Sequence, residues 1–254
     1  MVFYFSGTGN SKHIADKIAN STGERIVSIC ERAIEKNDTY EVGEDERIGF
    51  VFPVYWYSMP TIVEKFTNQL NLWGYEKQYV YAVTTYGIAA GNVMDRLTKI
   101  LRQKQVKLSG VFGVKMVDNY VVGYDIVDIN KQRIILNNAE LEIDKIISMI
   151  KRRANAQYIK KGVIAFVTPV TRYAYRKTDH TKKFFATEQC NGCKECERGC
   201  PCNAIHMKNR KPVWAGECTF CLKCIHNCRQ SAVQYGKFTA KRSRYQYKEP
   251  FSDN

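Results

Sequence analysis

The chain has 254 residues, more than one ordinary domain of about 150 residues needs, so its length predicts one large domain or two small ones. Hydrophobic residues make up 44% of it and only 6 residues are proline, which excludes a disordered or fibrous protein. No apolar run approaches the roughly 18 residues of a membrane helix, and the first residues lack the charged start of a secretion signal. We therefore expect a globular, cytoplasmic protein with no transmembrane segment.

The charge is unevenly distributed along the chain. The formal net charge is +14, and residues 151–187 alone hold ten Lys and Arg residues against one acid, Asp179. The predicted organisation is a first domain over residues 1–152, a basic connector over 153–181, a cysteine module over 182–236 and a basic tail over 237–254.

The first 150 residues alternate short β-rich runs with amphipathic helical patterns, which is typical of a parallel sheet covered by helices on both faces. This alternation predicts a doubly wound, five-stranded α/β domain. The expected strands are Val2–Phe5, Arg25–Ile29, Arg47–Phe52, Gln78–Thr84 and Val111–Met116, and the expected helices carry Ile14–Ala19, Ile62–Leu70, Val93–Leu101 and Ile135–Ile150. The pattern ends at Lys151, where a basic, tyrosine-rich stretch containing Pro169 predicts a connector.

The segment between the first strand and the first helix alternates hydroxyl side chains with glycines. The glycines let the backbone curl around an anion, and the start of the helix contributes N–H groups and a favourable dipole. The spacings of an ATP-binding P-loop and of a dinucleotide loop are absent. The pattern predicts a monophosphate site, with a tight turn that binds nothing as the alternative, at Ser6, Gly7, Thr8, Gly9, Asn10 and Ser11.

Two further loops follow the third and fourth predicted strands. In a doubly wound sheet these loops converge with residues 6–11 where the strand order reverses, which is a common ligand site. We expect the three aromatic residues of the first loop to stay outside the core and stack on a flavin ring, with a surface patch for a partner as the alternative. The candidate residues are Pro53, Val54, Tyr55, Trp56, Tyr57, Ser58, Thr84, Thr85, Tyr86 and Gly87.

Nine of the ten cysteines lie between Cys190 and Cys228, in two copies of the pattern C-x-x-C-x-x-C-x-x-x-C that are 28 residues apart. In a cytosolic chain such clustering indicates metal binding rather than disulfides. Three closely spaced thiolates can hold one [4Fe–4S] cluster, while the fourth ligates the cluster of the other copy. One predicted ligand set is Cys190, Cys193, Cys196 and Cys228, and the other is Cys218, Cys221, Cys224 and Cys200.

Two structural zinc sites are the alternative for these cysteines. Zinc needs four ligands per site and gives no reason for a third cysteine at the same spacing in both copies, so we favour the clusters. Arg229 replaces the proline that follows the first copy as Pro201, and Cys30 and Cys202 are expected to be packing residues.

With these motifs the chain resembles the flavodoxin–ferredoxin fusions of anaerobic bacteria and archaea. The resemblance rests on Ser6–Ser11, on the two cysteine repeats, and on Asp118-Asn119-Tyr120 after the fifth predicted strand. It implies a flavodoxin-like domain with strand order 2-1-3-4-5, followed by a small α+β ferredoxin domain with two [4Fe–4S] clusters. It also implies FMN bound by Ser6–Ser11, with ring contacts from the loops at residues 55–58 and 84–87 and from Asn119.

The sequence therefore predicts an electron-transfer protein that contains FMN and two [4Fe–4S] clusters and exchanges electrons with an acidic redox partner. No acid–base pair or nucleophile stands out: His13 is expected to be exposed, and His206 and His226 to be packing residues or donors to sulfur. One alternative is an FMN-dependent reductase of a small organic acceptor. Another is a protein that binds nucleic acid or a membrane surface; we expect no nucleic-acid partner.

Overall fold

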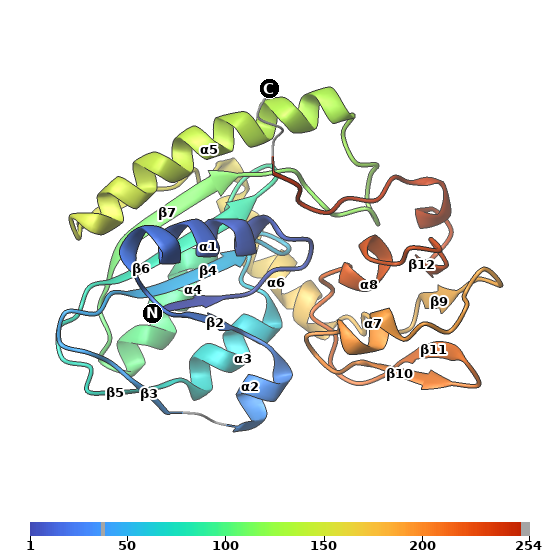
Figure 1. Ribbon diagram of the computed structural model, residues 1–254, viewed down its shortest axis with the longest axis horizontal. Helices are drawn as coiled ribbons and strands as arrows, with labels where there is room; N and C mark the ends of the chain where they lie inside the picture. Colours follow the sequence, from blue (N-terminus) through green and yellow to red (C-terminus); the bar gives the residue numbers. More distant parts are fainter. Residues whose placement is uncertain (37–38, 250–254) are drawn as a thin grey trace.

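A central sheet of six parallel strands, in the order β2-β1-β4-β6-β7-β8, organises the first part of the chain (Figure 1). The computed structural model describes residues 1–36 and 39–249. The strands of this sheet are β1 (Val2–Tyr4), β2 (Ile26–Ser28), β4 (Ile48–Pro53), β6 (Val80–Tyr86), β7 (Leu108–Lys115) and β8 (Ala156–Tyr158).

Helices cover both faces of the sheet, so the two central strands are buried along nearly their whole length. Residues 48–52 of β4 and all of β6 are buried, as the continuous apolar runs of a two-sided sheet require. In Figure 1, α1 and α5 lie over one face, and α3 and α4 over the other. The predicted α/β class with a parallel sheet is confirmed.

The residues before α1 and α5 explain why these helices begin where they do. α1 follows Gly9, whose φ of 105° is left-handed, and α5 follows Asp128, whose carboxylate accepts a hydrogen bond from the Lys131 N–H at 3.0 Å. Within the described residues, no helix combines the length and the apolar character needed to cross a membrane. The helices of this part are α1 (Asn10–Thr22), α2 (Glu31–Lys36), α3 (Thr61–Gln69), α4 (Val93–Gln103) and α5 (Ile129–Lys151).

The structure corrects the expected sheet and connector in several places. The sheet has six strands rather than five, because β8, from the predicted connector, pairs with β7. The connector also contains a 3₁₀ helix (Val163–Val167) and α6 (Thr168–Lys177). Pro169 occupies the first turn of α6, where its missing N–H costs no helical hydrogen bond. A separate parallel pair, β3 (Thr39–Glu41) and β5 (Asn71–Trp73), was not expected either.

The 28-residue cysteine repeat is also a structural repeat. α7 (Glu195–Arg198) and α8 (Lys223–His226) are 28 residues apart and pack together. Left-handed φ angles recur at the same offset: 74° at Gly192 and 56° at Phe220, and 66° at Lys194 and 58° at Leu222. The strands of the module are β9 (Phe184–Ala186), β10 (Ile205–Lys208), β11 (Lys211–Trp214) and β12 (Val233–Tyr235), and a 3₁₀ turn follows at Thr239–Lys241.

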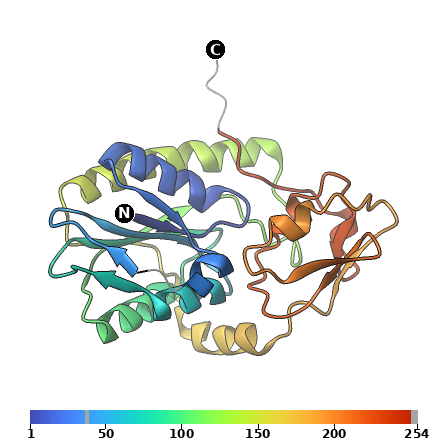
Figure 2. The ribbon, with the colours of Figure 1, turned by 60° about the horizontal axis from the view of Figure 1, so that its bottom comes forward.

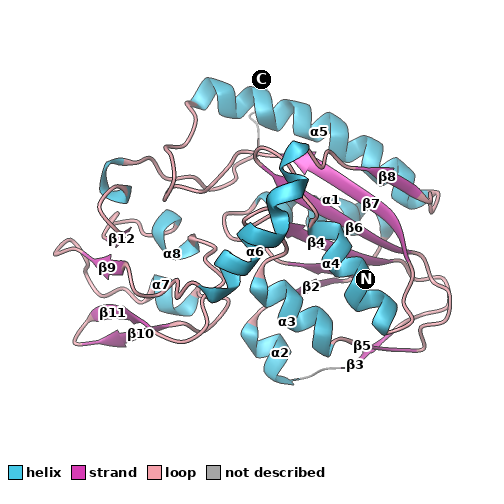
Figure 3. Cartoon of the chain, turned by 180° about the vertical axis from the view of Figure 1, so that it is seen from behind, coloured by secondary structure: helices cyan, strands magenta, loops and turns pink. Residues whose placement is uncertain are grey.

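The cysteine module docks against the carboxyl edge of the large sheet, and two segments connect the two parts (Figure 2). α6 is one of them: the Tyr175 hydroxyl donates to the Thr219 carbonyl at 2.7 Å. The tail is the other: the Tyr247 N–H donates to the Thr8 carbonyl at 2.8 Å. Figure 3 shows α6 crossing from the sheet domain toward the module.

Gly49 gives a direct test of the packing between the central strands. It pairs with Tyr81 in the β4–β6 register, and a Cβ at this position would meet the buried Tyr81 ring, with Cε2 at 2.7 Å. We expect Gly49→Ala to lower the free energy of unfolding by about 1–3 kcal/mol in urea titrations. The control Gly43→Ala, whose Cβ would be 3.8 Å from the nearest atom, is expected to change it by less than about 0.5 kcal/mol.

Candidate functional site

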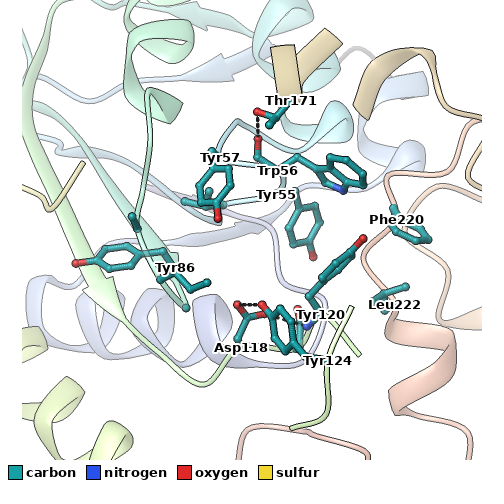
Figure 4. A pocket seen from close by; sticks show the side chains of 15 residues that line it. Tyr55, Trp56, Tyr57, Tyr86, Asp118, Tyr120, Tyr124, Thr171, Phe220 and Leu222 are labelled. Atoms are coloured by element: carbon teal, nitrogen blue, oxygen red, sulfur yellow. Dashed lines mark hydrogen bonds between the residues drawn. The ribbon is translucent and has the colours of Figure 1, made fainter. Parts of the chain in front are cut away.

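Two adjoining cavities lie at the carboxyl edge of the sheet, where the loops after β1, β4, β6 and β7 meet. The larger one, the ring cavity, has a volume of about 240 Å³ (Figure 4). The smaller one, the anion cavity, is lined by the loop after β1 together with residues at the ends of β4, β6 and β7. The two cavities have six lining residues in common, so they form one elongated site. These residues are Val54, Tyr55, Tyr86, Gly87, Asp118 and Asn119.

The loop after β1 presents backbone donors to the anion cavity. Gly9 adopts a left-handed conformation and no side chain caps α1. The first N–H groups of a helix have no acceptor inside it, and they carry the positive end of the helix dipole. Ser6, Gly7, Thr8, Asn10 and Ser11 all line this cavity.

Side chains of the same loop hold its shape. The Asn10 amide donates to the Val117 carbonyl at 2.9 Å, and its oxygen accepts from the Tyr245 hydroxyl at 2.6 Å. The Ser11 and Thr85 hydroxyls are 2.9 Å apart, within hydrogen-bond distance. These contacts use the side chains of Asn10 and Ser11, whereas the Ser6 and Thr8 hydroxyls accept from the Gly9 N–H and the Asn119 amide, so their O–H groups and the backbone N–H groups remain as donors toward the cavity.

Tyr245 tests whether the tail supports this loop. Tyr245→Phe would leave the buried Asn10 oxygen without its 2.6 Å donor, so we expect a loss of about 1–3 kcal/mol in the free energy of unfolding, measured in urea. Tyr158→Phe is a matched control, because that hydroxyl is exposed and bonds the Glu142 carboxylate. Equal, small losses in both variants would show that the tail contributes nothing to the loop.

The aromatic loop after β4 forms a strained two-residue turn. Tyr55 and Ser58 exchange backbone hydrogen bonds of 2.9 and 2.8 Å. Trp56 and Tyr57 between them have φ angles of 52° and 58°, in the region that glycine normally occupies in such turns. Strain of this kind concentrates at functional sites. The expectation that all three aromatics avoid the core was wrong for Tyr55, which is 9% exposed.

Two buried polar atoms of this turn have no hydrogen-bond partner in the part of the chain that the structure describes. They are the Tyr55 hydroxyl and the Trp56 indole nitrogen, and both residues line the ring cavity. Burial raises the pKa of Tyr55 well above its usual value, so its hydroxyl keeps its proton. Both groups can therefore donate to an acceptor atom of a bound ligand.

A carboxylate and a phenol lie together on another wall of the ring cavity. The Tyr124 hydroxyl donates to the Asp118 carboxylate, which also accepts from the Tyr120 N–H at 2.9 Å. Burial and the negative charge of Asp118 raise the pKa of Tyr124. Gly87 is required beside this pair, because a Cβ there would overlap the Asp118 carboxylate.

The cysteine module closes the remaining side of the ring cavity. Phe220 and Leu222, which alternate with Cys218, Cys221 and Cys224 along the chain, line the cavity directly. The module also touches the anion loop, because a Cβ at Gly7 would lie 2.8 Å from the Cys221 carbonyl oxygen. Only a glycine at position 7 permits this approach.

The two cysteine sets differ in environment. Cys193 is exposed, whereas Cys221 is 8% exposed and faces the first domain. Burial raises the pKa of the Cys218 thiol to about 12 and that of Cys221 to about 11. Backbone N–H groups of Phe220 and Ala204 point at the sulfurs of Cys218 and Cys200, each at 3.4 Å.

No three His, Cys, Asp or Glu side chains within residues 1–36 and 39–249 are grouped as ligands of a single metal ion. The cysteines are thus not arranged around one point. The predicted cluster ligands remain a prediction, and each set would have to surround a four-iron unit rather than a single ion.

Most of the predicted flavin-site residues come together at the two cavities. The exceptions are Gly9, Ser58 and Thr84, which line neither cavity. Thr84 is fully buried and its hydroxyl donates to the Phe52 carbonyl at 2.9 Å, since β6 is covered on both faces. The lining residues that the sequence analysis did not single out include Tyr124, Thr171, Phe220 and Leu222.

A signal for two of these residues was present in the repeat. Phe220 and Leu222 correspond to Gly192 and Lys194 of the first copy. Large apolar residues in only one copy indicate that this copy is covered by another part of the chain. Thr171 and Tyr124 carry no comparable signal.

The histidines also differ from expectation. His13 is half-buried rather than exposed: its Nε2 lies 2.7 Å from a Glu140 oxygen, and its ring stacks on Tyr247 at 4.3 Å. His226 accepts from the Tyr245 N–H through Nδ1, so Nε2 carries the proton and donates to the Asn119 carbonyl at 2.8 Å. His226 therefore links the module, the tail and the first domain rather than donating to sulfur.

Comparison with known proteins supports the assignment of the first domain. Residues 1–119 match the family model of the flavodoxin domain, so the chain contains a flavodoxin-like domain. The match ends before the two cysteine repeats, which begin at Cys190. No curated protein matches the chain.

Solved structures that match the chain share little of its sequence and have low TM-scores. A putative flavoprotein from Bacteroides uniformis is 16% identical, with 45% of this chain and 88% of that chain covered and a TM-score of 0.35. The Trp repressor binding protein from Bacillus subtilis is 13% identical (60% and 99% covered, TM-score 0.38). An azoreductase from Bacillus anthracis is 10% identical (57% and 97%, TM-score 0.36). These similarities define neither a ligand nor an activity for this chain.

Proposed function

We propose that this chain is an electron-transfer protein that holds FMN in its two joined cavities and two [4Fe–4S] clusters in its cysteine module. The observation that carries this proposal is the shared wall: Phe220 and Leu222 line the ring cavity while they separate the cysteines of the second set. When bound, FMN accepts one or two electrons, whereas a [4Fe–4S] cluster carries one.

The residues of the elongated site fit FMN. The uncapped start of α1 and the loop hydroxyls supply donors for a phosphate dianion. The ring cavity is lined mostly by aromatic and apolar side chains, which suit a flat aromatic ring. The unpartnered donors of Tyr55 and Trp56 suit a ring that carries carbonyl oxygens and nitrogens.

The cysteine module fits two clusters by its chemistry. Each copy supplies three thiols at matching positions and a fourth thiol for the other copy. N–H groups directed at the sulfurs of Cys200 and Cys218 are the kind of hydrogen bond that tunes the potential of such a cluster. Cys193 is exposed, and we call this end of the module the outer end. Cys221 is buried beside the proposed flavin site, at what we call the inner end.

Rapid mixing tests this proposal. With one electron equivalent of a chemical reductant, the iron–sulfur and flavin absorbances of the holoprotein should change in sequence, at a rate independent of protein concentration. A rate proportional to concentration would show that electrons pass between molecules and would contradict transfer across the shared wall.

Reduction of a small organic acceptor is a second candidate, favoured by the Asp118–Tyr124 pair on the cavity wall. Such a reduction consumes two electrons and at least one proton, and the Asp118–Tyr124 pair gives the cavity a polar wall on which an acceptor can be oriented. Saturable steady-state turnover that falls in Tyr124→Phe, with flavin binding unchanged, would support the reductase over the carrier.

We further propose that an acidic redox protein docks at the outer end of the module. Lys194 is exposed there, and Arg198, which also lines a cavity with residues 6–9, donates from its guanidinium to the Cys193 carbonyl at 3.1 Å. The basic residues of 151–183 form no continuous positive rim for such a partner, because several of these cations pair with carboxylates. The pairs are Arg153–Asp45, Lys161–Asp95, Arg172–Glu64, Arg176–Glu64 and Lys182–Asp179.

Salt dependence tests the acidic partner. The second-order rate of electron exchange with an acidic ferredoxin should fall steeply as ionic strength rises, because exposed charges are screened over about 8–10 Å near physiological salt. Lys194→Glu combined with Arg198→Glu should slow the reaction at low salt and flatten the dependence. Lys99→Glu with Arg102→Glu, both exposed on α4, is the charge-matched control. A rate indifferent to salt would leave the partner proposal without support.

A further inference from the structure

A stripe of exposed apolar side chains runs along the outer face of the 3₁₀ helix at Val163–Val167 and of α6. The exposed fractions are 89% for Val163 and Phe166, 72% for Val170 and 67% for Tyr173, with Val167 at 42%. Scattered exposed apolar residues need no explanation, but five within eleven residues form a contiguous feature.

The spacing places these side chains on one side. Positions 163, 166, 167, 170 and 173 follow the i, i+3, i+4, i+7 pattern of a single helical face. The opposite side is anchored: Thr171 donates to the Trp56 carbonyl at 2.9 Å, and Tyr175 is buried. α6 is therefore held by its inner face, and its outer stripe has no partner within the described residues.

Positive charge predominates around this stripe, although Lys161, Arg172 and Arg176 pair with Asp95 and Glu64. No Asp or Glu occurs between Asp144 and Asp179, a stretch that holds nine Lys and Arg residues. Lys160 and Lys177 are exposed at the two ends of the stripe and form no ion pair with any described residue. An apolar face bordered by Lys and Arg is the composition of helices that lie in the interface of an anionic bilayer.

We propose that the stripe of Val163, Phe166, Val167, Val170 and Tyr173 docks this protein on the surface of a membrane that contains anionic lipids. The apolar side chains would enter the boundary between headgroups and acyl chains, and Lys160 and Lys177 would contact headgroup phosphates. This inference is independent of the proposed electron-transfer function.

Two other occupants fit less well. A second copy of this chain would bring two basic stretches together, since a two-fold interface places the same patch on both sides. An acidic protein would need a complementary groove for a protruding ridge of Val, Phe and Tyr side chains, whereas lipid accepts such a ridge without one.

Vesicle co-sedimentation of the holoprotein tests the proposal. Vesicles of phosphatidylcholine mixed with phosphatidylglycerol should bind it, and pure phosphatidylcholine vesicles should bind it at least about tenfold more weakly. Val163→Ser, Phe166→Ser and Val170→Ser combined should reduce binding to the anionic vesicles by at least about tenfold. Lys160→Gln and Lys177→Gln should each cost about fivefold.

The matched control removes equally exposed apolar residues elsewhere. Ile134→Ser combined with Leu141→Ser changes α5, where these side chains are 61% and 62% exposed, and should leave vesicle binding unchanged. Unchanged circular dichroism and visible absorbance of the triple variant show that it is folded. Equal binding of the triple variant and the wild type would overturn the proposal. So would a dimer in sedimentation velocity that the triple variant abolishes, or binding of the stripe to an acidic protein but to no vesicle.

Discussion

FMN is expected to bind this chain at least about a hundredfold more tightly than riboflavin. The two ligands differ only in the phosphate, which the loop at Ser6–Ser11 would hold with backbone N–H groups and hydroxyls. Hydrogen bonds to a charged group are worth about 1.5–3 kcal/mol each, so two of them account for this ratio. Fluorescence titration of flavin-free protein with each ligand measures it.

Variants of the loop separate the phosphate site from the ring cavity. Ser6→Ala combined with Thr8→Ala should weaken FMN binding by at least about tenfold and riboflavin binding by much less, because riboflavin loses only the support that the Thr8 hydroxyl gives to the Asn119 amide at 3.1 Å. Ser21→Ala, an exposed serine near the end of the same helix, is the control and should change neither affinity. Equal affinity for FMN and riboflavin in the wild type would mean that the loop binds no phosphate.

The sheet domain could be predicted because its signals are local. Continuous apolar runs such as Ile48–Phe52 identify strands buried on both faces, and the period of Ile143, Ile146, Ile147 and Ile150 identifies a helix with one buried side. The loop at Ser6–Ser11 also carries a local signal, since a glycine after a strand permits the left-handed conformation that Gly9 adopts.

The elements that the sequence did not predict depend on distant contacts. β8 has three residues and exists because it pairs with β7, and α6 is fixed by its contacts with Trp56 and Thr219. Tyr124 reaches the site only because Asp118 accepts its hydroxyl. The local sequence around β8, α6 or Tyr124 does not indicate which distant residues these segments contact. The exception is the comparison of the two cysteine copies, where the apolar side chains of Phe220 and Leu222 mark the covered face.

Anaerobically purified protein is expected to contain about eight iron and eight sulfide per chain, as two [4Fe–4S] clusters require. Replacing one ligand should remove one cluster and leave about four iron. Cys30→Ser is the control, because Cys30 lies outside both repeats, and it should retain all of the iron. Iron and acid-labile sulfide analysis with electron paramagnetic resonance measures these contents. Stoichiometric zinc without broad visible absorbance would contradict the assignment.

The two ends of the module should respond differently to the loss of a ligand. Cys193 is exposed and lines neither cavity, so Cys193→Ser should remove the outer cluster and leave FMN affinity unchanged. The Cys221 backbone packs against Gly7, and its neighbours Phe220 and Leu222 line the ring cavity. Cys221→Ser should therefore remove the inner cluster and also weaken FMN binding, because the segment that closes the cavity loses its metal anchor. If both variants lowered FMN affinity equally, or neither did, the inner cysteines would not support the flavin site. That result would contradict the role proposed for Phe220 and Leu222 as the wall between the flavin site and the inner cluster.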